Sequence, residues 1–238
     1  MRKFVSAIII LGVILSGYAQ AYTDVSDLEL ENELELLSKY EIISGYEDGT
    51  FRPYNNITRA EFCKLIVCAT MNDYIEEYEK AFVDVEDGFW AESYIYAARE
   101  LGIVNGVTET IFDPQSNITN EQAVKMIVCA LGYSNEAIEK GGYPNGYIEV
   151  AKGLGIIKNS SFNGKDISTR KGIADMVYNM IDVPLFFIYK SEDGSIERSE
   201  AENTLREIHE LSIWDSDDNI ESDGIEEQDL YFEIDSVG

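Results

Sequence analysis

The sequence predicts a mainly α-helical protein, built as a pseudo-threefold module of three helix-loop-helix repeats around a central three-helix bundle. The first observation is an internal repeat: a shift of 61 positions places Phe51 on Phe112 and Thr58 on Thr119, and a shorter third copy contains Thr169. The second is the helical spacing of apolar residues behind each threonine. One unit of this size cannot bury its own apolar face, so neighbouring copies must pack together and leave recurring grooves between them.

The first 21 residues have the pattern of a cleaved secretory signal. Two basic residues precede an apolar run over 4–15, and residues 19–21 read Ala-Gln-Ala, a site that a signal peptidase accepts. A retained membrane anchor is the alternative, but the run is shorter than the roughly 18 to 20 residues of a membrane span. We expect the mature chain to begin at Tyr22 and to leave the membrane after cleavage.

Capping boxes mark the start of the second helix in two units. In Thr58-x-x-Glu61 the hydroxyl accepts from the third helical amide while the carboxylate accepts from the cap amide, and Thr119-x-x-Gln122 repeats the pattern. Apolar residues follow at i, i+3, i+4 and i+7 in all three units. The stripes are Phe62, Leu65, Ile66 and Ala69; Ala123, Met126, Ile127 and Ala130; and Ile173, Met176, Val177 and Met180. These three helices are expected to form the central bundle.

Each unit also has a first helix, clearest from Trp90 to Leu101, and the same register in the third unit contains Tyr143. Its apolar face in the second unit is expected to hold Tyr94, Ala97, Ala98 and Leu101. Asp48-Gly49 predicts a tight turn in the loop that follows the first of these helices. The predicted units are 22–73, 80–133 and a degenerate third one at 141–183.

The loop and helix start of the first unit carry a long motif. From Ile42 to Glu61 the chain contains Ile-Ile-Ser-Gly-Tyr-Glu-Asp-Gly-Thr-Phe-Arg-Pro and then Ile-Thr-Arg-Ala-Glu. With this motif the units resemble S-layer homology repeats, over roughly residues 22–183. The resemblance implies three repeats folded as one module. It also implies a non-catalytic function: holding an exported bacterial protein, without a covalent link, to an anionic secondary polysaccharide of a Gram-positive-type cell wall.

That resemblance also sets the alternative function and the location. The protein is expected at the cell surface, in the wall or surface layer, where other surface-layer proteins are further candidate partners. The alternative is an S-layer or envelope assembly protein whose grooves are occupied by protein packing instead of glycan.

Arg59 is the leading candidate for ligand contact. It occupies the first helical position, where the helix dipole costs a cation about 0.3–1 kcal/mol, and Arg170 repeats the anomaly in the third unit. Such a cation is explained if an anion binds there, because helix amides and guanidinium then converge on it. The alternative is a salt bridge to Asp24, Asp84 or Glu61. The resemblance favours ligand contact, since the family uses this arginine on its wall polymer.

Aromatic and acidic residues complete the predicted site. Trp90 and its equivalent Tyr143 could stack on a sugar ring or pack on the neighbouring unit, and Tyr46 invites the same two interpretations. Asp24 and Asp84 would either cap a helix or accept a sugar hydroxyl. The full polysaccharide-binding set is Arg59, Arg170, Trp90, Tyr143, Tyr46, Asp24, Asp84, Thr58, Glu61 and Asn120.

The three grooves cannot be equal. Asn120 replaces the arginine in the second unit, and Glu29 stands in the first unit where the second has Trp90. We rank first a groove with Arg59 beside the Trp90 helix, second one with Arg170 and Tyr143, and last the groove that depends on Asn120.

Charge excludes two classes of partner. The chain has 18 basic and 45 acidic residues and a formal net charge of −27, which repels nucleic acid and anionic membranes. Wall polymers are usually anionic too, so binding would depend on a few local donors and should strengthen as salt screens the remaining surface.

No metal site, cofactor or enzymatic activity is expected. Cys63, Cys68 and Cys129 form no Cys-x-x-Cys pair, there is a single histidine, His209, and common nucleophile and phosphate-loop motifs are missing from the sequence. The cysteines are interpreted as small buried apolar residues, with a Cys68–Cys129 bridge as the alternative.

Residues 184–238 form an acidic C-terminal segment. From Ser191 onward there are 17 acidic and 2 basic residues, so we expect a partly disordered tail with one helix over 200–211 and one candidate strand over 230–234. Residues 215–226 match the ligand spacing of a calcium loop, but Ile220 replaces the required glycine and calcium binding is not expected.

Overall fold

The computed structural model describes residues 22–70, 80–190 and 196–217, and within them the protein is mainly α-helical, as predicted. The predicted signal peptide, the 230–234 strand and most of the calcium-like loop lie outside the described residues. The elements in chain order are α1 (Leu28–Lys39), α2 (Arg59–Thr70), α3 (Glu92–Glu100), α4 (Asn120–Ala130), α5 (Ser134–Glu139), α6 (Asn145–Gly153), α7 (Arg170–Met180), β1 (Phe186–Lys190), β2 (Ile196–Glu200) and α8 (Leu205–Asp217).

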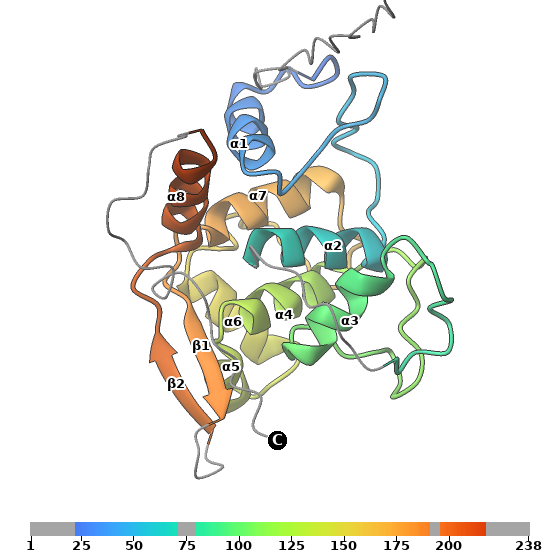
Figure 1. Ribbon diagram of the computed structural model, residues 1–238, viewed down its shortest axis with the longest axis vertical. Coiled ribbons are helices and arrows are strands. Elements are labelled where there is room, and N and C mark those ends of the chain that lie inside the picture. The colour runs from blue at the N-terminus through green and yellow to red at the C-terminus, as the bar shows by residue number, and fades with distance from the viewer. Residues whose placement is uncertain (1–21, 71–79, 191–195, 218–238) are drawn as a thin grey trace, which may run out of the picture.

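The core is built on α2, α4 and α7, where α4 contacts both of the other helices (Figure 1). The predicted apolar stripes of these three helices are buried, except that Ala130 at the end of α4 is half-buried. Both capping boxes form, and Thr169 caps α7 by accepting from the Gly172 amide at 3.2 Å. Local sequence signals therefore set where each central helix begins.

A closed ring of three backbone hydrogen bonds joins the units just before these helices. The Ile118 amide donates to the Ile57 carbonyl at 3.0 Å, Ser168 donates to Ile118 at 2.9 Å, and Ile57 donates to Ser168 at 3.4 Å. Each unit gives one donor and one acceptor, so the three helix starts are related by a pseudo-threefold arrangement.

The first helix of each unit packs on the second helix of the preceding unit. In this order α3 lies on α2, α6 lies on α4, and α1 lies on α7 (Figure 1). The predicted face of the Trp90–Leu101 helix is partly wrong: Ile95 is fully buried, whereas Leu101 is 44% exposed. The reason is that α3 ends at Glu100 and Gly102, with φ 68°, turns the chain away.

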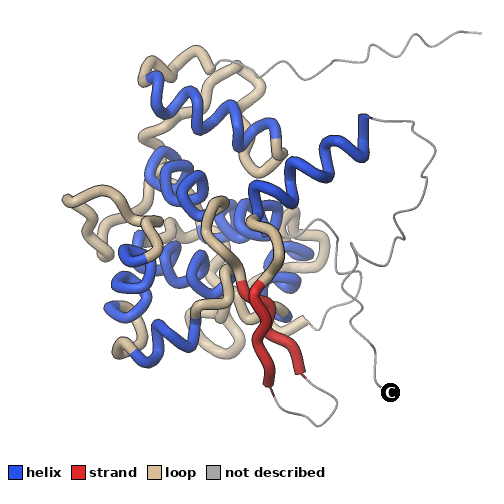
Figure 2. Tube along the Cα trace, turned by 90° about the vertical axis from the view of Figure 1, so that its left-hand side faces the viewer, coloured by secondary structure: helices blue, strands red, loops and turns tan. Residues whose placement is uncertain are grey.

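The C-terminal segment differs from its expected form. Strands β1 and β2 pair antiparallel, from Phe186 opposite Glu200 to Lys190 opposite Ile196, and project from the helices (Figure 2). The predicted helix exists but runs over 205–217 instead of 200–211. Leu185 and Leu205 are 5% and 1% exposed and join the core of the repeats. The described residues of the segment up to Leu211 thus include structure that packs on the repeats.

Helix α8 is fixed to the first unit by a small set of contacts. The His209 Nε2 lies 3.0 Å from the Ala69 carbonyl oxygen, and the imidazole stacks on Tyr40 with centroids 5.2 Å apart. The Tyr40 hydroxyl donates to Glu210 at 3.0 Å. Arg206 forms an ion pair with Asp182 at the end of α7, so α8 connects the first and third units.

The three cysteines are free thiols. Cys63 is buried, while Cys68 and Cys129 are half-buried, and burial raises the pKa of all three. The predicted role as small apolar residues fits this placement, and the alternative Cys68–Cys129 bridge is not formed.

Candidate functional site between the units

Arg59 begins α2 and reaches into the loop of the second unit. Its side chain is 6% exposed, Nε donates to the Phe112 carbonyl at 3.0 Å, and the guanidinium carbon lies 4.8 Å from the Phe112 ring centroid. Burial lowers the pKa of Arg59. Within the described residues, Arg59 forms no ion pair with Asp24, Asp84 or Glu61, and neither Nη atom has a hydrogen-bond partner. A backbone carbonyl holds the group and leaves its two terminal nitrogens available.

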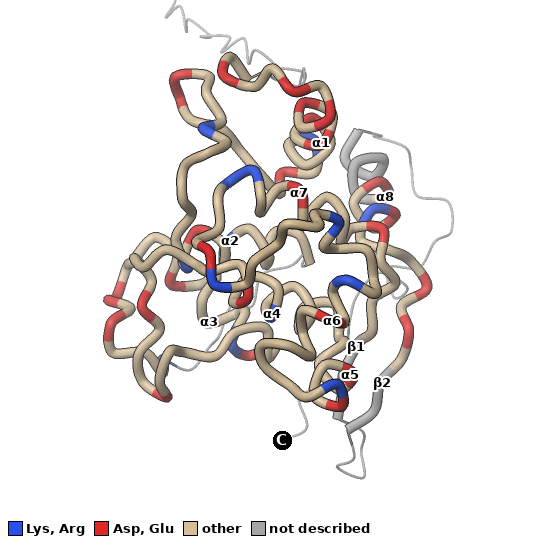
Figure 3. Tube along the Cα trace, turned by 180° about the vertical axis from the view of Figure 1, so that it is seen from behind, with Lys and Arg blue, Asp and Glu red and all other residues tan. Residues whose placement is uncertain are grey.

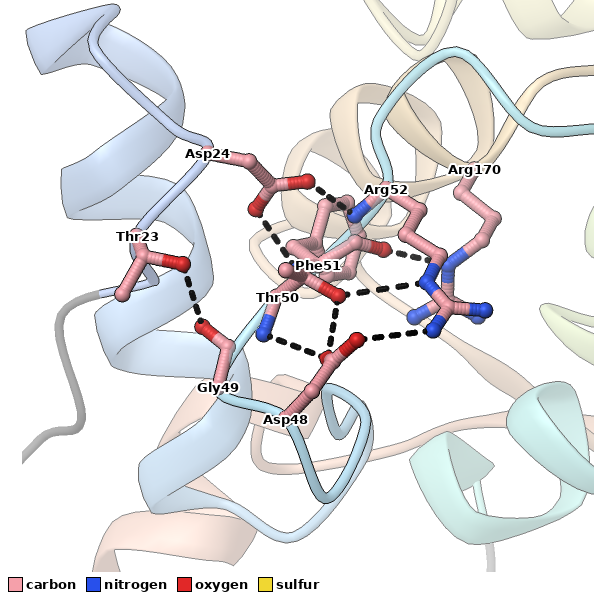
Figure 4. Close-up of polar contacts among 8 residues, drawn as sticks. All are labelled: Thr23, Asp24, Asp48, Gly49, Thr50, Phe51, Arg52 and Arg170. Carbon is pink, nitrogen blue, oxygen red and sulfur yellow. Dashed lines mark hydrogen bonds and ion pairs between the residues drawn. The ribbon is translucent and has the colours of Figure 1, made fainter.

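Arg170 makes the equivalent contact from the third unit to the first, but uses more of its donors. Its Nε donates to the Phe51 carbonyl and its Nη2 to the Ser44 carbonyl, both at 2.8 Å. The guanidinium carbon lies 4.5 Å from the Phe51 ring centroid and 5.1 Å from that of Tyr46. Figure 4 shows Arg170 pointing at the Phe51 backbone within this loop. Two of its three nitrogen atoms therefore bond across the contact between units.

Asn120 is the neutral member of the set. Its Nδ2 donates to the Asn163 carbonyl of the third unit at 2.9 Å, and its Oδ1 accepts from the Ser168 hydroxyl at 2.7 Å. All three residues after the capping threonines thus join one unit to the loop of another, through backbone carbonyls and not through the carboxylates that the alternative interpretation of the arginines required.

The amides at the helix starts are already bonded, which corrects one sequence-based expectation. Arg59, Asn120 and Arg170 each donate their backbone amide to a carbonyl of another unit at 2.9 Å. The next amides do the same, through Ala60 to Pro114, Glu121 to Gly164 and Lys171 to Pro53. An anion therefore cannot use these amides together with the guanidinium, and only side-chain donors are left for it.

Asp24 and Asp84 brace the loops instead of capping helices, so the capping interpretation is wrong. Asp24 accepts from the Phe51 and Arg52 amides at 2.7 and 2.8 Å, and Asp84 accepts from the Phe112 and Asp113 amides at 2.9 and 2.7 Å. Burial raises the pKa of Asp24, but the two loop amides outweigh it and the net shift is downward. Arg52 and Asp113 have φ of 58° and 62°, a left-handed conformation that these carboxylates help to hold.

The first-unit loop contains a second cluster of side chains (Figure 4). Asp48 accepts from the Thr50 amide at 3.1 Å and forms an ion pair with Arg52 at 2.9 Å. The Arg52 guanidinium carbon lies 3.8 Å from the Tyr46 ring centroid. Tyr46 thus contacts two arginines, Arg52 and Arg170. Sequence analysis did not select Arg52; its signal was the arginine inside the motif, next to the proline.

Thr58 and Glu61 are committed to the helix cap. The Glu61 Oε2 accepts from the Thr58 amide at 2.7 Å and from the Thr58 hydroxyl at 2.9 Å. These bonds position α2, and through it Arg59.

The exposed aromatic residues lie where the units meet. Tyr143 is 48% exposed, its hydroxyl donates to Glu121 at 3.2 Å, and the Lys125 Nζ lies 5.7 Å from its ring centroid. Tyr143 is also in electrostatic range of Arg59, a pairing that differs from the expected one with Arg170. Glu121 and Lys125 were missed because no motif distinguishes them from other charges on a helix surface.

Trp90 is 53% exposed and packs on Phe89, with ring centroids 5.5 Å apart. The residues that precede Trp90 in the chain line a cavity of about 360 Å³. Its lining residues are Asp84, Glu86, Asp87, Gly88, Phe89, Pro114 and Gln115. Its carboxylates would accept hydroxyl donors, while the acidic positions across the rest of the chain (Figure 3) disfavour anions away from the arginines.

No helix in the described part of the chain is both long and apolar enough to cross a bilayer. Nor do three metal-ligating side chains gather at one place in that part of the chain.

Comparison with known proteins gives consistent matches. The S-layer homology domain matches residues 21–63 and 82–124. The chain is 32% identical to the Middle cell wall protein of Brevibacillus brevis, over 67% of this chain and 15% of that protein. It is 29% identical to the Surface layer protein of Brevibacillus choshinensis, over 76% and 17%, and 27% identical to Exoglucanase XynX of Acetivibrio thermocellus, over 68% and 16%. The chain spans about a sixth of the length of these relatives.

Proposed function

The chain belongs to the S-layer homology domain proteins, and from this premise we propose that it is a non-catalytic module that anchors to the cell wall by binding an anionic secondary polysaccharide between its units. We also propose that the residues from about 141 onward, which carry α6 and α7, are a third repeat of the same family. We further propose that the protein is secreted to the cell surface after removal of residues 1–21.

The observation that carries the proposal is the burial of Arg59 with its terminal nitrogens unbonded within the described residues. Its side chain is buried among the units, and within the described residues only Nε is hydrogen-bonded. The carboxylates of Asp113 and Asp84 act on the guanidinium from electrostatic range without forming an ion pair. A buried cation that lacks a directly paired carboxylate is costly, and a bound anion would offset that cost. A carboxylate or phosphate of a polymer could bond both Nη atoms at once, which is the geometry that guanidinium favours.

Tyr143 adds a platform beside this charge. Its ring is half exposed, is fixed by the bond to Glu121, and lies in electrostatic range of Arg59. An exposed aromatic ring next to a charged hydrogen-bonding group suits a sugar that carries an acidic substituent. We therefore place the leading groove at Arg59 and Tyr143, and rank the Arg170 groove below it because two of the Arg170 nitrogens are bonded to backbone carbonyls.

Purified wall sacculi, with and without their non-peptidoglycan polymer, test the proposal. The full chain is expected to sediment with intact sacculi and not with stripped ones. Arg59→Gln should reduce the bound fraction roughly tenfold or more, as expected for a lost charged contact. Lys152→Gln, an exposed cation at the end of α6, is the matched control and should bind like the parent chain.

Binding that survives stripping, or that is equal for Arg59→Gln and Lys152→Gln, would contradict the proposal. Sedimentation with stripped sacculi only when other surface-layer proteins are present would instead support the alternative, an assembly role.

A further inference from the structure

The ring of units is closed without a covalent link between α1 and α7. The other two junctions join units that follow one another in the chain, α3 on α2 and α6 on α4, whereas α1 and α7 belong to the first and the last unit (Figure 1). We call the contact between α1 and α7 the seam. Its stability depends on the non-covalent contacts between the first and third units and on the clamp from α8.

Two carboxyl groups meet in the seam. Glu33 of α1 is 8% exposed, and its Oε2 is buried without a hydrogen-bond donor among the described residues. Asp175 lies on α7, the helix that packs against α1, and it is the charged group that acts most strongly on Glu33. Two carboxylates are both acceptors, so they can bond to each other only when one of them carries a proton.

The surrounding charges only partly offset the repulsion. Lys171 of α7 lies 3.1 Å from Asp175 and 3.9 Å from Asp27, while Glu29 on α1 adds another negative charge near Glu33. At the other end of α1, the charged groups that α8 directs at Tyr40 are Arg206 and Glu210. Lys171 therefore offsets part of the negative charge around Glu33, but it is shared with the carboxylates of Asp175 and Asp27.

The equivalent positions at the other two junctions hold a different pair. Counting from the capping threonines and from the ends of the first helices, Asp175 corresponds to Lys64 and Lys125, and Glu33 corresponds to Tyr94 and Tyr147. Lys64 lies 5.8 Å from the Tyr94 ring centroid, a favourable cation–π distance. Among the three junctions, the paired carboxyls thus occur at the one whose two helices lie farthest apart in the chain.

Opening the seam would disassemble the Arg170 cluster. The acceptors of Arg170 are the carbonyls of Ser44 and Phe51, which follow α1 in the chain, and the Phe51 amide is held by Asp24, which precedes α1. The backbone amides of Arg170 and Lys171 at the start of α7 donate to the carbonyls of Asn55 and Pro53, which also belong to the first unit. Displacement of the first unit from α7 would break this whole set together.

We propose that Glu33 and Asp175 form a proton-dependent latch, which keeps the seam and the Arg170 groove closed when one proton is shared and lets them open when both carboxyls are ionised. The link from latch to groove rests on the proposed wall-binding function, while the latch itself does not.

The direction of the pH effect follows from where the proton binds. Burial and Asp175 raise the pKa of Glu33 to about 7 in the closed form, against an ordinary value of 4.5. The closed form therefore holds the proton more tightly than the open form. Opening should increase from about pH 4.5 to pH 7 and level off above that range, with a change of roughly tenfold in the opening constant between pH 6 and pH 8.

Hydrogen exchange of the full chain, corrected for the intrinsic pH dependence of exchange, tests the latch. Amides of α1, residues 50–56 and the start of α7 should open roughly tenfold more at pH 8 than at pH 6, while the junction between α4 and α6 should not change. Glu33→Gln keeps the shape and can donate a hydrogen bond, so it should abolish this pH dependence. Glu35→Gln, an exposed glutamate on the same helix, should behave like the parent chain.

A second variant covers the case in which Glu33→Gln does not fold. The double change Glu33→Tyr with Asp175→Lys copies the pair at the α2–α3 junction and should close the seam at every pH. The latch is refuted if the parent chain shows no excess opening at pH 8, or if the folded variant keeps the same pH dependence as the parent.

Sedimentation with intact sacculi at pH 6 and pH 8 then tests the link to the groove. We expect the parent chain to lose more binding at pH 8 than Glu33→Gln does. Equal losses in the two proteins, despite a working latch by exchange, would overturn the link. No binding by either protein at any pH would overturn the proposed function and leave the latch result standing.

Discussion

The Tyr40 ring stacks on His209 at a centroid distance of 5.2 Å, and this contact joins the end of the first helix to the last described helix. His209 also lies 3.0 Å from the Ala69 carbonyl at the end of α2. A segment that composition alone assigns to a solvated tail thus stabilises the junction between the first and third units.

Removal of residues 184–238 should therefore destabilise the repeats. Leu185 and Leu205 are almost fully buried, and burial of one leucine contributes about 1.5–3 kcal/mol, so we expect the melting temperature to fall by roughly 10 °C. A chain that ends at Asp217 retains both strands and α8, and is the control. Equal melting temperatures for the chains ending at Val183 and at Asp217 would show that the packing of α8 contributes nothing.

His209 should make stability fall in mild acid. Burial lowers the pKa of His209 in the folded protein, so the folded state keeps it neutral while the unfolded chain becomes charged below about pH 6.5. The stability is fully present above that pH and decreases as the pH falls through 6.5. Urea unfolding of Glu33→Gln, with and without His209→Phe, isolates this effect from the carboxyl pair. The phenylalanine variant should have the flatter pH profile between 6.5 and 5.

Arg170→Gln should cost stability more than Arg59→Gln does. Arg170 donates to two backbone carbonyls and Arg59 to one, and each such bond from a charged group contributes about 1.5–3 kcal/mol. We expect losses of about 3–6 kcal/mol and about 1.5–3 kcal/mol respectively, measured by urea unfolding. Wall binding should show the opposite order. A variant pair with the same order in both measurements would contradict the division of roles.

Asn120→Arg should strengthen the weakest groove. The Asn163 carbonyl already accepts from this position, as Phe112 and Phe51 accept from the two arginines, so an arginine Nε has a partner there. Two free Nη groups would then be added beside the third-unit loop. Titration onto sacculi should give a higher affinity or stoichiometry, and Asn120→Gln serves as the control. An unchanged isotherm for Asn120→Arg would exclude this groove from binding.

The sequence was sufficient for the central helices because their signals are local. Thr58, Thr119 and their partners at the third helical position fix the helix starts, and the apolar spacing behind them names the buried face. The packing of α1 on α7 is non-local. The spacing of residues in the sequence does not indicate which unit's second helix the first helix of a given unit will contact.

The candidate site was only partly predictable for a similar reason. Arg59, Arg170 and Asn120 were found from their place after the cap, but their acceptors are carbonyls of other units, which have no residue-type signature. Leu185, Leu205 and His209 were overlooked because an acidic composition averages over the few side chains that actually contact the core.

The ring formed by Ile57, Ile118 and Ser168 limits how such a protein can grow. Each of these residues donates its amide to one neighbour and accepts with its carbonyl from the other, so the three leave none of their backbone amides or carbonyls unpaired at the axis. A fourth unit inserted into the chain could join only by displacing one of the three. Gene duplication within this fold should therefore succeed by whole triplets and fail by single units.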